Sequence, residues 1–168
     1  MNKRHGFTIL ELVLYLGLLG IFLVIMTNLF VASLDTQLES QDQSALQQNG
    51  RYLIQRFTYD LHRAHTISSP NLGNQATSLD LIINDNGVDK HFIYTLNNQN
   101  LILTVNEQQW QLNSQDTVLA DLNFHRLGNS DINPQAKDGV QISFTLQSVV
   151  EKNSGGSVKN FQTFINLK

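Results

Sequence analysis

The sequence contains no cysteine, a single tryptophan and fewer basic than acidic residues, 11 against 14. Because cysteine is missing, no disulfide can stabilise the fold, which must rely on packing and sheet hydrogen bonds. The net charge of −3 argues against a generally basic nucleic-acid binder. A stacking strip for single-stranded nucleic acid needs several aromatic residues, so we expect the lone Trp110 to pack in the core or within a strand.

Motifs of common enzymes are missing as well. The chain contains no G-x-S-x-G, no P-loop and no G-x-G-x-x-G sequence, so the usual signatures of α/β-hydrolases and of nucleotide-binding loops are absent. Scattered Ser, His and Asp residues neither support nor exclude a catalytic triad. We therefore predict that the chain is not an enzyme and uses no cofactor.

A long apolar run dominates the first part of the chain. Residues 12–34 include no charged side chain, and roughly 20 such residues are enough for a helix to cross a bilayer. Lys3, Arg4 and His5 precede the run, which predicts a cytoplasmic start and an outward-facing remainder. The run is too long for a secretory signal, and no A-x-A cleavage pattern follows it. The sequence predicts a single-pass membrane helix.

Glu11 does not fit an ordinary membrane anchor. It lies near the start of the apolar run, where an unpaired carboxylate costs on the order of 2 to 3 kcal/mol or more. No cation within the run can pair with it. The nearest positive charges are the short basic head and the amino group that a cut before Phe7 would create.

Residues 3–11 (KRHGFTILE), followed by the apolar helix, resemble the class III signal of type IV pilins and type II secretion pseudopilins. The matching features are a glycine that closes a basic leader, a phenylalanine after it and a glutamate at the fifth mature position. The resemblance implies that a prepilin peptidase cuts after Gly6 and methylates the new amino terminus on Phe7. It also implies that Glu11 pairs with the amino terminus of a neighbouring subunit during assembly. The implied partners are other pilins or pseudopilins, the peptidase and an inner-membrane assembly platform.

Helical periodicity continues beyond the apolar run. Residues 35–49 are polar and lack proline, which favours continuation of the same helix. Beyond them an apolar face recurs at steps of seven, four, four and three residues, formed by Leu46, Leu53, Phe57, Leu61 and Ala64. Pro70 should end the helix, so we expect one helix from about Phe7 to Thr66. The predicted divisions are a leader (1–6), a membrane helix (7–34), an amphipathic helix (35–67) and a head (68–168).

After Pro70 the apolar period changes to two, which indicates strands. Apolar runs at residues 79–83 and 92–96 flank Asn86-Gly87, a strong hairpin signal because both positions tolerate positive φ. Turns at residues 97–100 and 106–107 lead to further strands at 101–105 and 110–112, and others are expected at 118–127, 140–150 and 161–167. The predicted fold class is α+β, with a long helix laid on an antiparallel sheet, a pilin-like arrangement.

Two further segments resemble minor pilins of the W and J types. Residues 52–64 are similar to the helix end of those proteins, and residues 118–124 to a strand of their heads. Asn28 occupies the position where major pilins usually carry proline, which favours a minor subunit that initiates or caps a filament. The alternative is a pilin-like tip adhesin or a DNA-binding module of a competence pilus, so nucleic acid is left open as a partner. The sequence does not choose among a motility pilus, a competence pilus and a secretion system.

Three groups of polar side chains were compared with known metal sites, and no metal is predicted at any of them. They are His62 with His65 near Asp60, Asp80 with Asp85 and Asp89, and Asp131 with Asn133 and Asp138. The two histidines are one helical turn apart, but exposed histidines on a polar helix face are commoner than zinc ligands. The second group lacks EF-hand spacing. The third shares a loop, and although major pseudopilins carry a calcium loop, a solvated turn is favoured.

Overall fold

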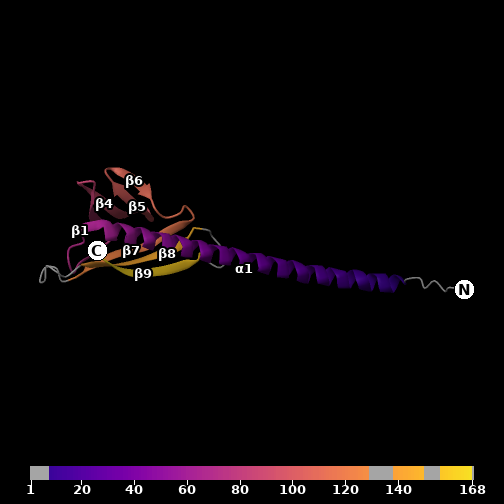
Figure 1. Ribbon diagram of the computed structural model, residues 1–168. Coiled ribbons are helices and arrows are strands. Elements are labelled where there is room, and N and C mark those ends of the chain that lie inside the picture. The colour runs from indigo at the N-terminus through magenta and orange to yellow at the C-terminus, as the bar shows by residue number, and fades with distance from the viewer. Residues whose placement is uncertain (1–7, 129–137, 150–155, 168) are drawn as a thin grey trace. The chain divides into compact units, whose positions relative to one another are not determined.

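The computed structural model describes residues 8–128, 138–149 and 156–167. In these residues one helix, α1 (Ile9–Arg63), precedes nine strands. Figure 1 shows the helix followed by the strands of the head. The predicted α+β class with a long N-terminal helix is confirmed. The chain divides into two compact units, Met1–Gln41 and Asp42–Lys168, and α1 belongs to both.

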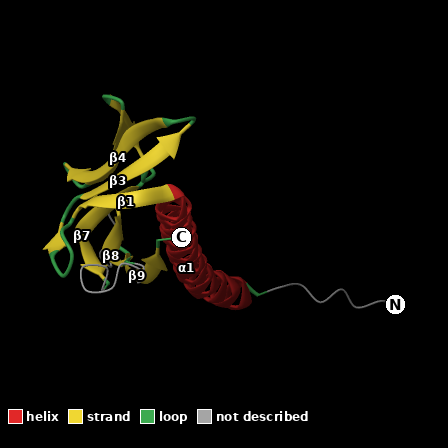
Figure 2. Ribbon diagram, turned by 60° about the vertical axis from the view of Figure 1, so that its left-hand side comes forward, coloured by secondary structure: helices red, strands yellow, loops and turns green. Residues whose placement is uncertain are grey.

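The strands form two antiparallel sheets, whereas a single sheet was expected. The five-stranded sheet has the order β1-β3-β4-β5-β6, with β1 (Ala64–Ser69), β3 (Leu79–Asp85), β4 (Val88–Asn97), β5 (Asn100–Val105) and β6 (Gln108–Gln111). The four-stranded sheet has the order β2-β7-β8-β9, with β2 (Gln75–Ala76), β7 (Thr117–Leu127), β8 (Gly139–Ser148) and β9 (Val158–Asn166). Figure 2 shows both sheets beside the end of α1.

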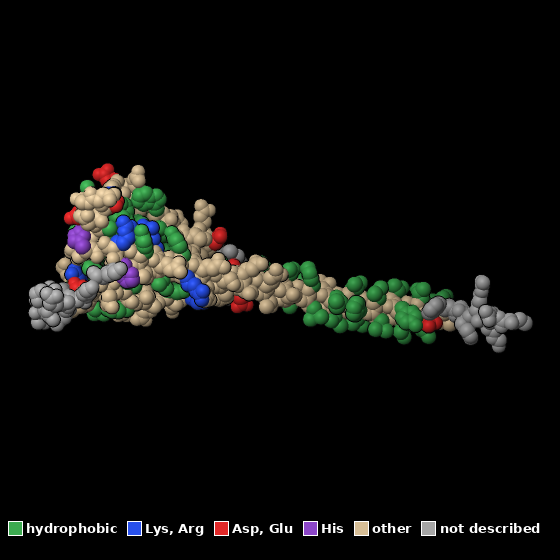
Figure 3. Space-filling model, in the orientation of Figure 1, with side chains coloured by type: hydrophobic (Ala, Val, Ile, Leu, Met, Phe, Trp, Pro, Cys, Tyr) green, Lys and Arg blue, Asp and Glu red, His purple; other side chains and the backbone are tan. Residues whose placement is uncertain are grey.

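In its described residues, 8–41, the first unit is a helical segment with no buried side chain. Every large apolar side chain in residues 12–31 is 47 to 64% exposed, and these side chains cover the helix in Figure 3. They occupy consecutive positions, so they surround the helix, which is typical of a membrane span or a buried core helix. The helix is long and apolar enough to cross a membrane.

The second half of α1 buries the face that the sequence predicted. Leu46, Leu53, Phe57 and Leu61 are all fully buried. The predicted helix end is wrong, however, because α1 ends at Arg63 and Ala64–Ser69 forms β1, which pairs with β3. Register shifts in β1 place buried residues three apart, at Ala64 and Ile67, so the strand imitates a helical period.

The three predicted turns are confirmed by their backbone angles. Each joins neighbouring antiparallel strands through a pair of residues with positive φ, the conformation that two-residue hairpins require. The pairs are Asn86 and Gly87, Asn98 and Gln99, and Asn106 and Glu107. The hairpins fix the register of β3, β4, β5 and β6, so alternate side chains of these strands face α1.

Phe57 lies where α1 meets both sheets. Its ring centroid is 5.0 Å from that of Tyr94 in β4, 5.6 Å from that of Phe124 in β7 and 6.3 Å from that of Phe144 in β8. The Phe144 ring in turn stacks on Phe161 of β9 at 5.1 Å. Both sheets therefore bury their apolar sides against the same face of α1.

Arg126 of β7 connects the two sheets through polar contacts. Its Nη1 donates a hydrogen bond to the carbonyl oxygen of Ile67 in β1 at 2.8 Å. Its Nε and Nη2 donate to Oδ2 of Asp138 at 3.0 and 2.6 Å, and Asp138 is only 6% exposed. Two charge-assisted hydrogen bonds to one largely desolvated oxygen are stronger than a surface ion pair. They fix the guanidinium that holds β1, at the edge of the five-stranded sheet, through the Ile67 carbonyl.

Gly50 provides a sharp test of this packing. A Cβ atom there would lie 2.1 to 2.5 Å from three ring atoms of Phe161. Alanine normally stabilises a helix interior relative to glycine, but Gly50→Ala should destabilise the head by roughly 1 to 3 kcal/mol through overpacking. Thermal unfolding of a soluble fragment lacking residues 1–34 would measure the change. Gln48→Ala, at an exposed position on the same helix, should have little effect, and Phe161→Leu should partly rescue Gly50→Ala. An unchanged or raised Tm for Gly50→Ala would contradict the packing described.

Candidate functional site

The start of α1 is organised by Thr8. The backbone N–H of Glu11 lies 3.3 Å from Oγ1 of Thr8, and the N–H of Leu12 donates to the Thr8 carbonyl oxygen at 3.2 Å. Thr8 therefore occupies the N-cap position, and Glu11 is the third helical residue, the spacing of a capping box. A carboxylate in the first turn also interacts favourably with the positive end of the helix dipole.

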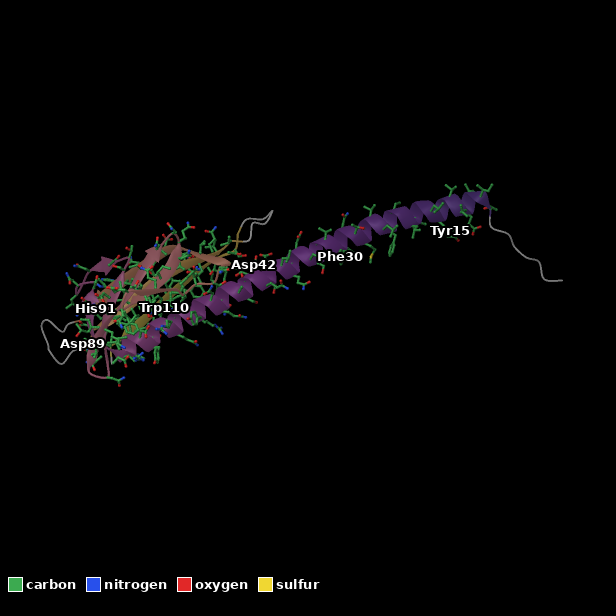
Figure 4. The ribbon with its side chains drawn as sticks, turned by 90° about the horizontal axis from the view of Figure 1, so that it is seen from above. Tyr15, Phe30, Asp42, Asp89, His91 and Trp110 are labelled. Carbon is green, nitrogen blue, oxygen red and sulfur yellow. The ribbon has the colours of Figure 1, made fainter. Side chains whose placement is uncertain are left out.

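The Glu11 carboxylate has a neighbour that the sequence analysis missed. The hydroxyl of Tyr15 (Figure 4) donates to Oε1 of Glu11 at 3.3 Å, one helical turn further on. The spacing of four residues is visible in the sequence, but a neutral hydroxyl is a less obvious partner for a carboxylate than a cation is. The contact is longer than usual for a hydroxyl donor, and a carboxylate can accept several hydrogen bonds. Glu11 therefore retains capacity for a second, positively charged partner.

The other predicted processing residues, Gly6 and Phe7, lie outside the described residues. Residues 1–27 match the family model described as the prokaryotic N-terminal methylation motif. The chain carries the N-terminal motif of type IV pilins and pseudopilins. No curated protein and no solved structure matches the chain. The pilin-type motif and the apolar helix together indicate a membrane-anchored subunit that assembles with other pilins.

The groups compared with metal sites do not form one in the described residues. His62 lies in the last turn of α1 whereas His65 lies in β1, so the expected helical spacing between them is wrong. Each aspartate near the Asn86-Gly87 turn has its own partner: Asp80 contacts His91 at 3.0 Å, Asp85 contacts Lys90 at 2.6 Å, and Asp89 accepts from Asn84 at 2.7 Å. Among described residues no three metal-binding side chains come together. Asp131 and Asn133 lie outside the described residues, and Asp138 pairs with Arg126.

A buried charged cluster inside the head also escaped the sequence analysis. Asp60 is fully buried on α1, with its Oδ2 2.8 Å from Nε of Arg56. The hydroxyl of Tyr94 in β4 donates to the same oxygen. Burial, the largest single influence, lowers the pKa of Arg56, but the charge of Asp60 and the contacts with Tyr94 and Asp60 together outweigh it, so the pKa is raised. The four-residue spacing of Arg56 and Asp60 was readable in the sequence, whereas the contribution of Tyr94 depends on the sheet.

The Tyr94 hydroxyl predicts how stability depends on pH. Burial, and then the charge of Asp60, raise the pKa of Tyr94 well above its ordinary value of 10.0. The folded protein thus holds the proton more tightly than the unfolded chain does. Stability is complete below pH 10 and should fall above it by about 1.4 kcal/mol per pH unit. Urea unfolding at pH 9 to 11 would measure the slope, which Tyr94→Phe should reduce. Identical slopes for the two proteins would contradict this assignment.

Proposed function

We propose that the chain is a minor subunit of a type IV pilus or of a type II secretion filament. In this proposal the apolar part of α1 inserts into the cytoplasmic membrane with the basic leader inside and the head outside. A prepilin peptidase cuts after Gly6 and methylates Phe7, and the subunit then enters a filament with other pilins. The observation that carries the proposal is the methylation motif at residues 1–27, followed by an uncovered apolar helix.

The exposed side chains of residues 12–31 support the assembly step. Full transfer of one large apolar side chain out of water contributes about 1.5 to 3 kcal/mol, and among the described residues none of these side chains is buried. It must therefore be covered by lipid or by other apolar helices. Both environments are those that a filament subunit occupies before and after assembly.

The minor-subunit role is supported by Asn28. The helix continues from Ile9 to Arg63 without interruption, and the position where major pilins usually carry proline holds asparagine. Gly17 and Gly20 also lie within this helix, and a Cβ atom added at either would meet open space. A subunit needed in few copies does not have to meet every packing requirement of a repeating filament core.

The DNA-binding alternative receives less support from the head. Arg56, Lys90 and Arg126 each lie within 2.8 Å of an aspartate, which lowers the positive charge available to phosphates. Arg63 lies over the ring of Tyr59, 5.0 Å from its centroid. A structural role in the filament is therefore favoured over nucleic-acid binding.

Processing can be tested by intact mass. Protein isolated from membranes of a host that has its own prepilin peptidase should begin at Phe7 and carry one added methyl group. Gly6→Leu should leave the leader attached, because the small residue at the cleavage position is lost. A product that still begins at Met1, or one cut near Ala32 after the apolar run, would refute the processing step.

The assembly role of Glu11 can be separated from its contact with Tyr15. Glu11→Gln and Glu11→Leu should insert into the membrane and leave the head's Tm unchanged. They should reduce the recovery of co-expressed pilins at least about tenfold, because a charge pair in an apolar environment is lost. Tyr15→Phe removes only the hydroxyl donor and should retain most of the recovery. Equal recovery from all four proteins would mean that Glu11 does not govern assembly.

A further inference from the structure

A groove on the head lies between α1 and the face of the five-stranded sheet that packs toward the helix. It has a volume of about 470 Å³, and its walls include Tyr52 and Arg56 from α1, Phe92 from β4, Leu103 and Val105 from β5, and Trp110 from β6. Tyr52 is 48% exposed and Trp110 is 45% exposed. Of the two places expected for Trp110, the strand is therefore confirmed, because it lies in β6, and the core is wrong. These half-exposed aromatic side chains are of the kind enriched at protein interfaces.

The groove adjoins an open sheet edge. Among the described strands β6 pairs only with β5, and all four of its residues are exposed. Leu112 donates its N–H to Leu101, and the pairing then alternates along the hairpin, with Trp110 opposite Leu103. In such a ladder every second residue directs its N–H and C=O away from the partner strand. In β6 these residues are Gln109 and Gln111.

Two other sheet edges, those at β1 and β9, differ from β6. At the opposite edge of the same sheet, the Ile67 carbonyl of β1 accepts a hydrogen bond from Arg126. β9 also ends its sheet, but its inner side is closed by Phe161, whose ring lies against Gly50. An uncovered strand edge is usually protected, because it invites pairing with another chain. β6 combines unpaired backbone groups with an apolar groove on the side where an added strand would place its side chains.

Charge further restricts what can bind. Arg56 is the only charged residue in the described lining of the groove, and its side chain is 31% exposed. Its Nε faces the buried Asp60, but a guanidinium has five N–H donors, so others are available to a second carboxylate. A strand with apolar side chains at alternate positions and one Asp or Glu among them could make all three contacts. It would pair with the backbone of β6, fill the groove with its apolar side chains and form an ion pair with Arg56.

We propose that β6 accepts an extended strand from the head of a neighbouring pilin-type subunit by β-strand addition. Alternate apolar side chains of that strand fill the groove beneath Tyr52 and Trp110, and a carboxylate meets Arg56. This inference rests on the proposed filament role, because it takes the neighbouring subunit as the partner.

The full-length protein permits a clean test because it has no cysteine. A benzophenone maleimide attached to Tyr52→Cys would report what occupies the groove when the protein is co-expressed with its pilins. Phe164→Cys, in β9 and 52% exposed, is the matched control site. In each background Gln109→Pro removes an outward N–H without removing a β5–β6 hydrogen bond, and Gln109→Ala retains that N–H.

Adducts from Tyr52→Cys should map to a strand of a pilin head. Their yield should fall roughly tenfold in Gln109→Pro and stay unchanged in Gln109→Ala, while adducts from Phe164→Cys keep their yield in both variants. A Tm for Gln109→Pro close to that of Gln109→Ala would establish that the head remains folded, and a fall in yield caused by unfolding would lower the Phe164→Cys yield as well.

The outcomes separate the inference from the filament role. If pilins co-purify but Tyr52→Cys forms no adduct, or if Gln109→Pro leaves the yield unchanged, strand addition is overturned and the filament role stands. Adducts that map to a partner's membrane helix, or only to proteins outside the pilin set, also overturn the proposal. Failure of pilins to co-purify at all would overturn both the inference and the filament role.

Discussion

The head depends on the contact between one face of α1 and two separate sheets. A sheet of four or five strands has an apolar side that must be covered, and in this chain the same helix residues cover both. Phe57 contacts aromatic rings from β4, β7 and β8. Loss of this helix face would expose the inner sides of both sheets at once, so the helix and the head form one cooperative unit from about Asp42 onward.

The same helix meets a different requirement nearer its start. In the second half of α1 apolar residues occupy one face, whereas in residues 12–31 they surround the helix and are exposed. A one-sided apolar face suits packing on a protein, and an all-round apolar surface suits lipid or a bundle of similar helices. Just before that apolar segment, the side-chain donor that the described residues offer to the Glu11 carboxylate is the neutral hydroxyl of Tyr15, which leaves room for a cationic partner.

The buried polar contacts of the head join its helix and its two sheets. Arg126, which pairs with Asp138, connects the two sheets through its hydrogen bond to the Ile67 carbonyl, and Asp60 with Arg56 and Tyr94 connects α1 to β4. Buried pairs of this type restrict the ways in which layers can pack, although an apolar replacement can be equally stable. Arg56 differs from the others because part of its side chain faces the groove, where it can contribute to recognition.

The sequence by itself determined the features that depend on neighbouring residues. The membrane helix follows from length and lack of charge, the buried face from Leu46 to Leu61 follows from helical period, and the Asn86-Gly87 turn follows from tolerance of positive φ. The motif at residues 1–27 is likewise continuous in the chain. Each of these properties is complete within a short segment, so it can be recognised before the chain folds.

Only the tertiary structure decided the features that join distant segments. Tyr94 meets Asp60 across 34 positions, and Gly50 is required by the ring of Phe161. Bulges in β1 give the buried residues Ala64 and Ile67 a spacing close to a helical period. The segment is nevertheless a strand, because it pairs with β3. Trp110 is half exposed because β6 ends its sheet, and strand order is set by which apolar faces can be buried together, a property that no local pattern contains.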